Sequence, residues 1–447
     1  MVTRTPTDRA SSSSRKEGLL YLSVLISGLA LAAAWWLPFE KRSSVLGRFN
    51  YWQVLILAGS AAIFVSLVAV VAARRARRRL VGFRIAAAWL GVAFSIGVVE
   101  LACFAWPPGH PENNPWYVSA KPEEDGLPFR RPPGIRWSGR VPGDTTFGAD
   151  PTALPITFQT DSNGFRNAET PRQADYVFIG DSFTEGCGVN ADDSFVQIVS
   201  DELQAPVANL GRSAYSPGPE LAVLKNYGLP LKPRTVIWQL CEGNDLEDGA
   251  TWLYWKKNGR PPFYAEGEQH RLTRSAAWQL RSPTFRLYAS LREWPWEGLF
   301  PDRSGQSISV RFFRPLHPAY HCPQNHPGWD VTVESLTEGH ELLRQQSIRL
   351  VVVLMPVKLR VLIPFVELDQ ETRTELLGQW RASPDATWSN YLSAFCSERE
   401  IEYIDLTEPL IEAGKRGVLT CLPYDSHLSP EGHRIVAQQI ASRLRTE

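Results

Sequence analysis

The chain has 447 residues, with 47 Lys and Arg against 47 Asp and Glu, and 44% of its residues are hydrophobic. This length allows one large domain with accessory segments, while 16 Trp and 21% charged residues exclude a disordered or fibrous protein. The charges are segregated, because residues 1–105 hold 13 basic and 4 acidic side chains and the remainder holds 34 and 43, a net charge of −9. An acidic body of this kind excludes the electrostatic footprint of a nucleic-acid-binding protein.

Three apolar stretches lie close together near the N-terminus. They cover residues 18–37, 51–73 and 85–106, which are 20, 23 and 22 residues long. A membrane-spanning helix needs about 20 apolar residues, so each stretch is long enough. A cleaved signal peptide has a single apolar core of about 7–15 residues, and three stretches exclude it. The sequence therefore predicts a membrane region over residues 1–106 with three transmembrane helices.

Basic residues between the second and third stretches predict the orientation of these helices. The connection contains six arginines, Arg74, Arg75, Arg77, Arg78, Arg79 and Arg84. An excess of Arg marks cytoplasmic loops, whereas the residues just after Trp106 are poor in Lys and Arg. We therefore expect a multi-pass protein of the cell membrane whose remaining chain lies outside the cytoplasm.

Five cysteines belong to that outer part, namely Cys187, Cys241, Cys322, Cys396 and Cys421. Because their number is odd, at most two disulfides can form among them and one thiol is left over. The spacing does not indicate which cysteines would pair.

The outer part reads as a linker followed by an α/β domain. Residues 107–172 are rich in Pro and Gly and predict an extracytoplasmic linker. Beyond it, apolar runs that predict strands alternate with segments of helical spacing. The strands are expected at 176–179, 207–210, 236–240, 350–355 and 403–406, and the helices at 193–203, 219–227, 332–345 and 430–444. This alternation is typical of a parallel sheet covered by helices on both faces.

Residues 246–330 interrupt the alternation and predict an insertion rich in Trp, Arg and Pro. One interpretation is that its aromatic residues stack on sugar rings or line an acyl pocket. The interpretation that we favour is that they form a small core of the insertion itself. These are Trp252, Tyr254, Trp255, Trp294 and Trp296. The segment also holds potential zinc ligands, His317, His321, Cys322 and His326. Their spacing matches no common zinc pattern, so we expect no metal.

The segment Gly180–Gly186, with the sequence GDSFTEG, follows the first predicted strand directly. Ligands of parallel sheets bind beyond the carboxyl ends of the strands, so Ser182 lies where a nucleophile belongs. A serine hydroxyl needs a general base, and the base needs an orienting partner. Asp425 and His427, on one short segment before the last helix, supply both. The alternatives are that Ser182 only caps a turn, and that His433 is the base.

Two further residues end predicted strands and suit an oxyanion hole. Gly211 ends the second strand, where a backbone N–H can approach an oxyanion closely. Asn244 follows the third strand and can donate from its side-chain amide. The alternatives are a glycine that merely ends a strand and an asparagine in an ordinary turn.

These residues together resemble the SGNH (GDSL-type) hydrolase family. Ser182 matches the serine of its first block, Gly211 the glycine of its second and Asn244 the asparagine of its third. The last block normally has Asp and His three residues apart, whereas Asp425 and His427 are two apart, a spacing similar to that of alginate-type O-acetyltransferases. Pro356-Val357-Lys358 also resembles a Pro-x-Lys element of membrane-tethered acetyltransferase-like members.

The resemblance covers residues 173–447 and implies a three-layer, flavodoxin-like SGNH hydrolase domain. It implies ester hydrolysis or acyl transfer through an acyl-serine, with Ser182, His427 and Asp425 as the catalytic residues and no cofactor. The oxyanion would be held by the Ser182 and Gly211 N–H groups and the Asn244 amide. We expect a serine esterase or acyltransferase that acts on acyl, most simply acetyl, groups of an envelope or extracellular carbohydrate.

Two alternatives remain, a lipid-directed esterase and a non-catalytic envelope-binding protein that has kept the fold. Either enzyme would meet an acylated carbohydrate or lipid at the membrane, and a transferase would also need a membrane partner that donates acyl groups. The sequence does not separate hydrolysis from transfer, because both reactions share the acyl-enzyme and differ in the hydroxyl that attacks it.

Overall fold

The computed structural model describes residues 51–105, 126–128, 130–140, 154–258, 296–312, 325–368, 370, 373–374 and 388–445. The chain divides into two compact units. In the described residues, one unit contains the helices up to Ala105 and the other contains the domain from Gly126 onward. Each unit is considered by itself.

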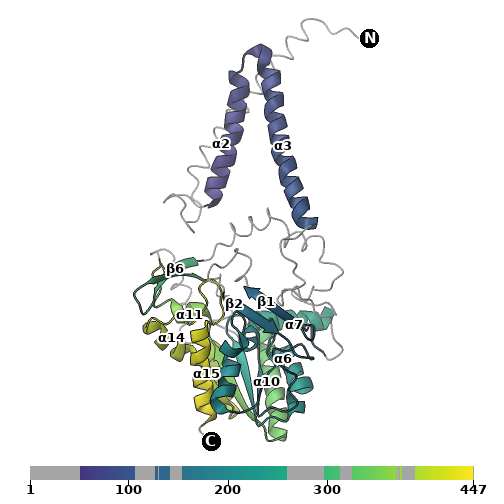
Figure 1. The fold of residues 1–447 in the computed structure, drawn as a ribbon, viewed down its shortest axis with the longest axis vertical. Helices are drawn as coiled ribbons and strands as arrows, with labels where there is room; N and C mark the ends of the chain where they lie inside the picture. The colour runs from purple at the N-terminus through teal and green to yellow at the C-terminus, as the bar shows by residue number, and fades with distance from the viewer. Residues whose placement is uncertain are drawn as a thin grey trace. The chain divides into compact units, whose positions relative to one another are not determined.

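Two apolar helices form the described part of the first unit. α2 spans Tyr51–Ala72 and α3 spans Arg78–Ala105, with a short 3₁₀ turn at Arg75–Arg77 between them. Figure 1 shows them as a hairpin. Arg78 closes the end of α2, because its Nε donates to the carbonyl oxygen of Ala73 at 3.1 Å.

One of these helices is a candidate membrane span. The segment Arg78–Val99 of α3 is long and apolar enough to cross a membrane, whereas the described apolar part of α2, Leu57–Ala72, is shorter. The large side chains of α3 are exposed, with Phe83 and Phe94 each at 74%. The first predicted stretch, 18–37, lies outside the described residues. The prediction of three transmembrane helices is therefore not confirmed, and a single candidate span remains.

The connection between α2 and α3 is shorter than the sequence predicted. Arg78, Arg79 and Arg84 lie in the first turns of α3 and not in a loop, so the helix begins before the predicted position 85. Arginine is a strong helix former, and its long side chain can reach a polar surface from within a helix. The apolar stretch alone therefore predicted a start for this helix that is several residues too late.

A parallel five-stranded sheet forms the centre of the second unit. Its strands are β3 (Tyr176–Ile179), β4 (Val207–Asn209), β5 (Thr235–Cys241), β8 (Arg349–Met355) and β9 (Glu402–Asp405). They lie in the order β4-β3-β5-β8-β9, and every neighbouring pair is parallel. This is the flavodoxin-like order, in which the chain reverses its direction of travel across the sheet between β3 and β5. The α/β prediction and its five strands are confirmed.

Helices cover both faces of this sheet. One face carries α6 (Pro217–Val223), α7 (Asp245–Asn258), α10 (Pro327–Gln345) and α13 (Trp388–Glu398). The other carries α5 (Phe195–Leu203), α11 (Lys358–Leu362), α14 (Thr407–Lys415) and α15 (Pro430–Leu444). Figure 1 shows α6 and α10 on one side of the strands and α14 and α15 on the other. α6 continues into a π-helical turn at Leu224–Gly228 and a 3₁₀ turn at Leu229–Leu231.

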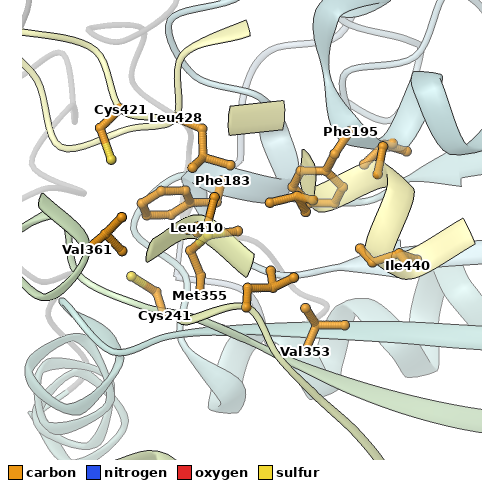
Figure 2. Close-up of a cluster of buried hydrophobic side chains, with 14 of the residues drawn as sticks. Phe183, Phe195, Cys241, Val353, Met355, Val361, Leu410, Cys421, Leu428 and Ile440 are labelled. Carbon is orange, nitrogen blue, oxygen red and sulfur yellow. The ribbon is translucent and has the colours of Figure 1, made fainter. Parts of the chain in front are cut away.

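Alternation along the strands divides the buried side chains between two cores. In β5, Trp238 and Leu240 belong to the core under α6 and α10, and Ile237 belongs to the core under α5 and α15. Figure 2 shows this second core, in which Phe195 and Ile440 from the helices lie with Val353 from the sheet. Strands buried on both faces account for the continuous apolar runs in the sequence.

The predicted linker contains a hairpin of its own. β1 (Arg136–Arg140) pairs antiparallel with β2 (Pro155–Gln159), and Phe158 of β2 is fully buried. The segment before β1 is also anchored, since Leu127 is fully buried in the core under α6. The end of the predicted linker is therefore part of the folded domain.

The described parts of the predicted insertion pack into the cores of the domain. Leu246 of α7 belongs to the core under α10. β6 (Trp296–Pro301) and β7 (Ser307–Phe312) form an antiparallel hairpin whose Phe300 and Phe312 join the core under α15. These described residues thus belong to the cores of the domain, and a core made by the insertion's own aromatic residues stays a prediction. Residues 259–295 and 313–324 lie outside the described residues.

Candidate active site

The serine of the GDS segment begins a one-turn helix at the carboxyl end of β3. This helix, α4, spans Ser182–Glu185 and is capped by Asp181, whose Oδ1 accepts from the Phe183 N–H at 2.9 Å. Gly186 ends the helix in the left-handed conformation at φ 80°. Ser182 therefore lies beyond the carboxyl end of β3, next to the switch point between β3 and β5 where flavodoxin-like sheets bind ligands.

Ser182, His427 and Asp425 form a continuous chain of hydrogen bonds. Ser182 Oγ lies 2.7 Å from His427 Nε2, and His427 Nδ1 lies 2.5 Å from Asp425 Oδ1. Burial is the largest single influence and raises the pKa of Asp425, but the charge and hydrogen bonds of His427 and the charge of Lys358 together lower it to about 2. The aspartate is thus ionised at neutral pH and faces the imidazole nitrogen that would carry a proton during base catalysis.

The same aspartate oxygen explains how a spacing of two residues is accommodated. Asp425 Oδ1 also accepts from the backbone N–H of His427 at 2.8 Å, which is a local turn closed by a side chain. In this turn the aspartate reaches both the backbone and the ring of the histidine two residues on. Phe183, which belongs to the second core in Figure 2, packs against the imidazole at 5.1 Å between ring centroids.

The alternative base, His433, lies in α15 with different contacts. Its ring stacks on Phe195 at 5.6 Å, and its Nδ1 accepts from the Phe195 N–H at 3.2 Å. It is 1% exposed, and burial lowers its pKa to about 3. The structure therefore brings His427, and not His433, to Ser182.

Gly211 allows the chain after β4 to pass close to α4. A Cβ at Gly211 would lie 2.4 Å from the backbone nitrogen of Glu185 and 2.6 Å from the carbonyl carbon of Thr184, so no other residue fits without a shift. The Gly211 N–H donates to Asn209 Oδ1 at 3.0 Å. The N–H group that we expected at an oxyanion thus has an acceptor within the protein.

Asn244 lies between β5 and α7, and its amide is held by Asp248. Its Nδ2 donates to Asp248 Oδ2 at 2.8 Å, and its side chain is one of the groups that lower the pKa of Asp181 against the effect of burial. The backbone N–H of Asp248 returns a bond to the Asn244 carbonyl oxygen at 2.9 Å. The amide is therefore held beside the residue that precedes the serine.

Sequence reasoning missed a cluster of acidic residues at this end of the sheet, of which Asp181, Glu220 and Asp245 are buried and Asp248 is half-buried. Asp181, Glu220, Asp245 and Asp248 interact with one another electrostatically, and burial is the largest cause of the raised pKa of each. For Asp248 the pKa reaches about 7. Glu220 Oε2 accepts from Trp238 Nε1 at 2.8 Å, and Asp245 Oδ2 accepts from the Cys241 N–H at 2.7 Å. Acidic residues at separate positions of α6 and α7 gave no signal in the sequence that they would meet.

Lys358 is a second residue whose contacts the sequence did not indicate. It is 5% exposed, and its Nζ donates to the carbonyl oxygens of Leu422, Pro423 and Asp425 at 2.7, 2.8 and 3.0 Å. These carbonyl groups belong to the loop that carries the aspartate and the histidine. The Pro-x-Lys element thus contacts the loop of the candidate site, although the two are more than 60 residues apart in sequence.

The described residues contain no group of three potential metal ligands. Of the four zinc candidates, only His326 is described, and its Nδ1 accepts from the Gly328 N–H at the start of α10. Cys187, Cys241, Cys396 and Cys421 are all buried free thiols, so no disulfide joins the described cysteines. Cys322 lies outside that part of the chain.

Of the aromatic residues in the predicted insertion, Trp252 packs on α6, where a Cβ at Gly218 would lie 2.7 Å from its ring. Tyr254 is 56% exposed on α7. Trp294 lies outside the described residues.

No protein-family model matches this chain, and no curated protein matches it either. Among solved structures, it is similar to a GDSL-like lipase from Bacteroides thetaiotaomicron, at 12% identity over 60% of this chain and 86% of that one, with a TM-score of 0.30. It is also similar to a catalytic mutant of an acetylxylan esterase from Geobacillus stearothermophilus, at 14% identity over 61% and 94% of the chains, with a TM-score of 0.32. A third structure, described as a lipolytic protein of the G-D-S-L family from Desulfitobacterium hafniense, has 15% identity over 60% and 97%, with a TM-score of 0.32.

Proposed function

We propose that the chain is a membrane-anchored serine esterase or acyltransferase of the SGNH type. The observation that carries the proposal is the hydrogen-bonded series Ser182–His427–Asp425 at the carboxyl end of a flavodoxin-like sheet. A hydroxyl, an imidazole and a carboxylate at these distances form the arrangement that activates a serine for attack on an acyl carbon.

The reaction would proceed in two steps. Ser182 Oγ forms a bond to the acyl carbon while His427 Nε2 takes the hydroxyl proton, and the imidazolium then gives this proton to the departing alcohol oxygen as the ester C–O bond breaks. In the second step, His427 takes a proton from water or from an acceptor hydroxyl, whose oxygen forms a bond to the acyl carbon of the acyl-serine. The imidazolium then gives this proton to Ser182 Oγ as the bond between the acyl carbon and Oγ breaks. Asp425 holds the ring and stabilises the imidazolium.

The developing oxyanion would be held by the Ser182 N–H, the Gly211 N–H and the Asn244 amide. Asp248 supports this assignment for Asn244, because it holds one amide hydrogen and so fixes the plane in which the other points. Gly211 would have to share its N–H between Asn209 Oδ1 and the oxyanion. The Asn244 contribution is therefore the one that the geometry favours most.

For the substrate, we propose an acyl group, most simply acetyl, on an envelope or extracellular carbohydrate. The support is the resemblance of the Asp-x-His spacing to that of alginate-type O-acetyltransferases. We also propose three membrane spans with the domain outside the cytoplasm. The support is the length of the three apolar stretches and the arginines in the turn after α2 and the first turns of α3.

The test is the release of acetate from an acetyl ester by the full chain in detergent, with Ser182→Ala alongside. Release by the parent that is lost in Ser182→Ala, by about 10³-fold or more, would support the proposed mechanism. If neither protein releases acetate, a serine-directed fluorophosphonate probe separates the remaining cases. Labelling of the parent alone would indicate a transferase that excludes water, and labelling of neither would contradict the proposal.

A further inference from the structure

A buried ion pair joins the segment before β1 to the helix that carries Ser182. Arg131 is 2% exposed, and Glu185, the last residue of α4, is 1% exposed. Arg131 Nε donates to Glu185 Oε1 at 2.5 Å, and Arg131 Nη2 donates to Glu185 Oε2 at 2.8 Å. Two parallel bonds of this kind fix the carboxylate in both distance and orientation.

The rest of the Glu185 carboxylate is bound by residues that follow β4. Its Oε2 accepts from the Ser213 N–H at 3.2 Å and from the Ser213 hydroxyl, and Arg212 Nη1 lies 3.9 Å away. Burial by itself raises the pKa of Glu185, but Arg131 and these donors bring it below its usual range. The carboxylate is therefore ionised, and removal of Arg131 would leave a buried charge that is poorly compensated.

The segment that carries Arg131 is seated on the domain at several points. We define the arm as residues 127–128 and 130–134. Leu127 is fully buried, and the Thr160 hydroxyl donates to the Pro132 carbonyl oxygen at 2.9 Å. At Gly164, with φ +83°, a Cβ would lie 2.2 Å from the Arg131 carbonyl oxygen, so only glycine allows this approach. The Arg131 guanidinium also lies over the ring of Phe158, 4.9 Å from its centroid.

α4 depends on such outside contacts because it is only one turn long. Within it, the Glu185 N–H donates to the Asp181 carbonyl oxygen at 3.0 Å. A helix of four residues gains too little from its own hydrogen bonds to hold a geometry alone. Ser182 lies at the start of this turn and Glu185 at its end, so a displaced Glu185 would move Ser182 Oγ from its position 2.7 Å from His427 Nε2.

We propose that Arg131 is a positioning residue for acyl transfer at Ser182, and that the arm is thereby part of the catalytic centre. This inference rests on the proposed function. α3 ends at Ala105, and the arm is the first described segment of the second unit that follows it in sequence. Acyl transfer would then require the seating of the segment that leads from the membrane region into the domain.

The test uses the full chain in detergent and the variants Arg131→Met, Arg131→Lys, Glu185→Gln and the Arg131→Met/Glu185→Gln double variant. The rate of fluorophosphonate labelling at Ser182 and the kcat and KM for an acetyl ester are measured well below the melting temperature. For Arg131→Met we expect the labelling rate and kcat to fall by about 10- to 100-fold, with KM within about twofold. The labelling rate and kcat of Arg131→Lys should lie between those of the parent and of Arg131→Met, because lysine keeps the charge and loses the two parallel hydrogen bonds. The double variant should be no slower than the slower single variant.

Arg234→Met is the matched control, since Arg234 forms an exposed ion pair with Asp175 at 2.8 Å, next to the amino end of β5. Its rates should equal those of the parent. A folded Arg131→Met that is labelled at the parental rate, even with a lower melting temperature, would overturn the inference and leave Arg131 as a purely structural residue. If Arg131→Met does not fold, Arg131→Lys decides, and a parental rate there has the same meaning. Failure of the proposed function itself is distinct, because then the parent and Ser182→Ala would be labelled equally.

Discussion

At the scale of single residues, Asp425 has two tasks within one short turn. Its Oδ1 closes the turn through the His427 N–H and also contacts His427 Nδ1. Orientation of the ring and compensation of its charge therefore depend on the same atom. An amide at this position would keep most of the shape but lose the charge and can present N–H to Nδ1, which favours the wrong tautomer of the imidazole.

We therefore expect Asp425→Asn to lower kcat for an acetyl ester by roughly 10²- to 10⁴-fold, with little loss of stability. The measurement is acetate release together with thermal unfolding, and Asp175→Asn, in an exposed ion pair, is the control. Parental activity in Asp425→Asn would show that another group orients the base.

Asp248 leads to a prediction about pH. Burial raises its pKa from 3.8 to about 7, so the folded domain keeps this proton in a range where the unfolded chain has lost it. The folded state binds more protons between these values, and its stability therefore falls as the pH rises from about 4 to about 7. Asp181, Glu220 and Asp245 shift in the same direction.

In Asp248→Asn this contribution is absent. We therefore expect the difference in free energy of unfolding, variant minus parent, to increase as the pH rises through this window. Above pH 7 this difference should be about 2–4 kcal/mol more favourable to the variant than at the acidic end of the window. Urea unfolding at pH 4.5 and pH 8 measures it, with the exposed Asp192→Asn as control. An equal difference between variant and parent at both pH values would refute the raised pKa.

At the scale of elements, the loop of residues 421–428 is fixed by α11 and by β7. Lys358, the first residue of α11, donates to three carbonyl oxygens of this loop, and the Arg311 side chain lies over the ring of Tyr424 at 4.4 Å. The Arg311 N–H also donates to the Pro423 carbonyl oxygen at 2.8 Å. The loop that carries Asp425 and His427 is thus held by two elements that are distant in sequence.

For Lys358→Met we expect kcat to fall by about 10- to 100-fold, because three buried carbonyl groups lose their donor and the loop shifts away from Ser182. Kinetics on the acetyl ester measure it, and Lys225→Met, at an exposed ion pair with Glu338, is the control. Unchanged kcat in a folded Lys358→Met would show that β7 alone holds the loop.

The strands and the candidate triad could be predicted from the sequence, because each depends on a local pattern. Continuous apolar runs marked β5 and β8, and short motifs marked Ser182 and His427 at strand or loop ends. The tertiary contacts of Arg131 and Lys358 could not be predicted, since a single basic residue has no pattern that names its partner. The core that the hairpin β6–β7 joins could not be predicted either, because strand alternation does not show which core a strand joins.

At the scale of the whole molecule, the chain combines an α/β domain with α3, a helix whose large apolar side chains are exposed. Leu90 is 71% exposed near the middle of the candidate span Arg78–Val99. A charge at the middle of a membrane span opposes insertion.

We expect Leu90→Arg to weaken membrane integration, with a cost of about 2.5–3.5 kcal/mol at the centre of a span. Extraction of membranes with alkaline carbonate measures it as protein released to the supernatant, and Tyr254→Arg, on the exposed face of α7, is the control. Complete retention of Leu90→Arg in the membrane pellet would mean that α3 is not required for anchoring.

The proposed nucleophile and the proposed base are separated by 245 positions of the chain, with Ser182 just after β3 and His427 just before α15. During synthesis, nearly the whole domain is therefore made before the imidazole that would activate the serine. Under the proposed mechanism, a nascent or truncated chain that ends before residue 427 has a serine without its base. Such an incomplete chain would be unable to hydrolyse esters in the cell that makes it.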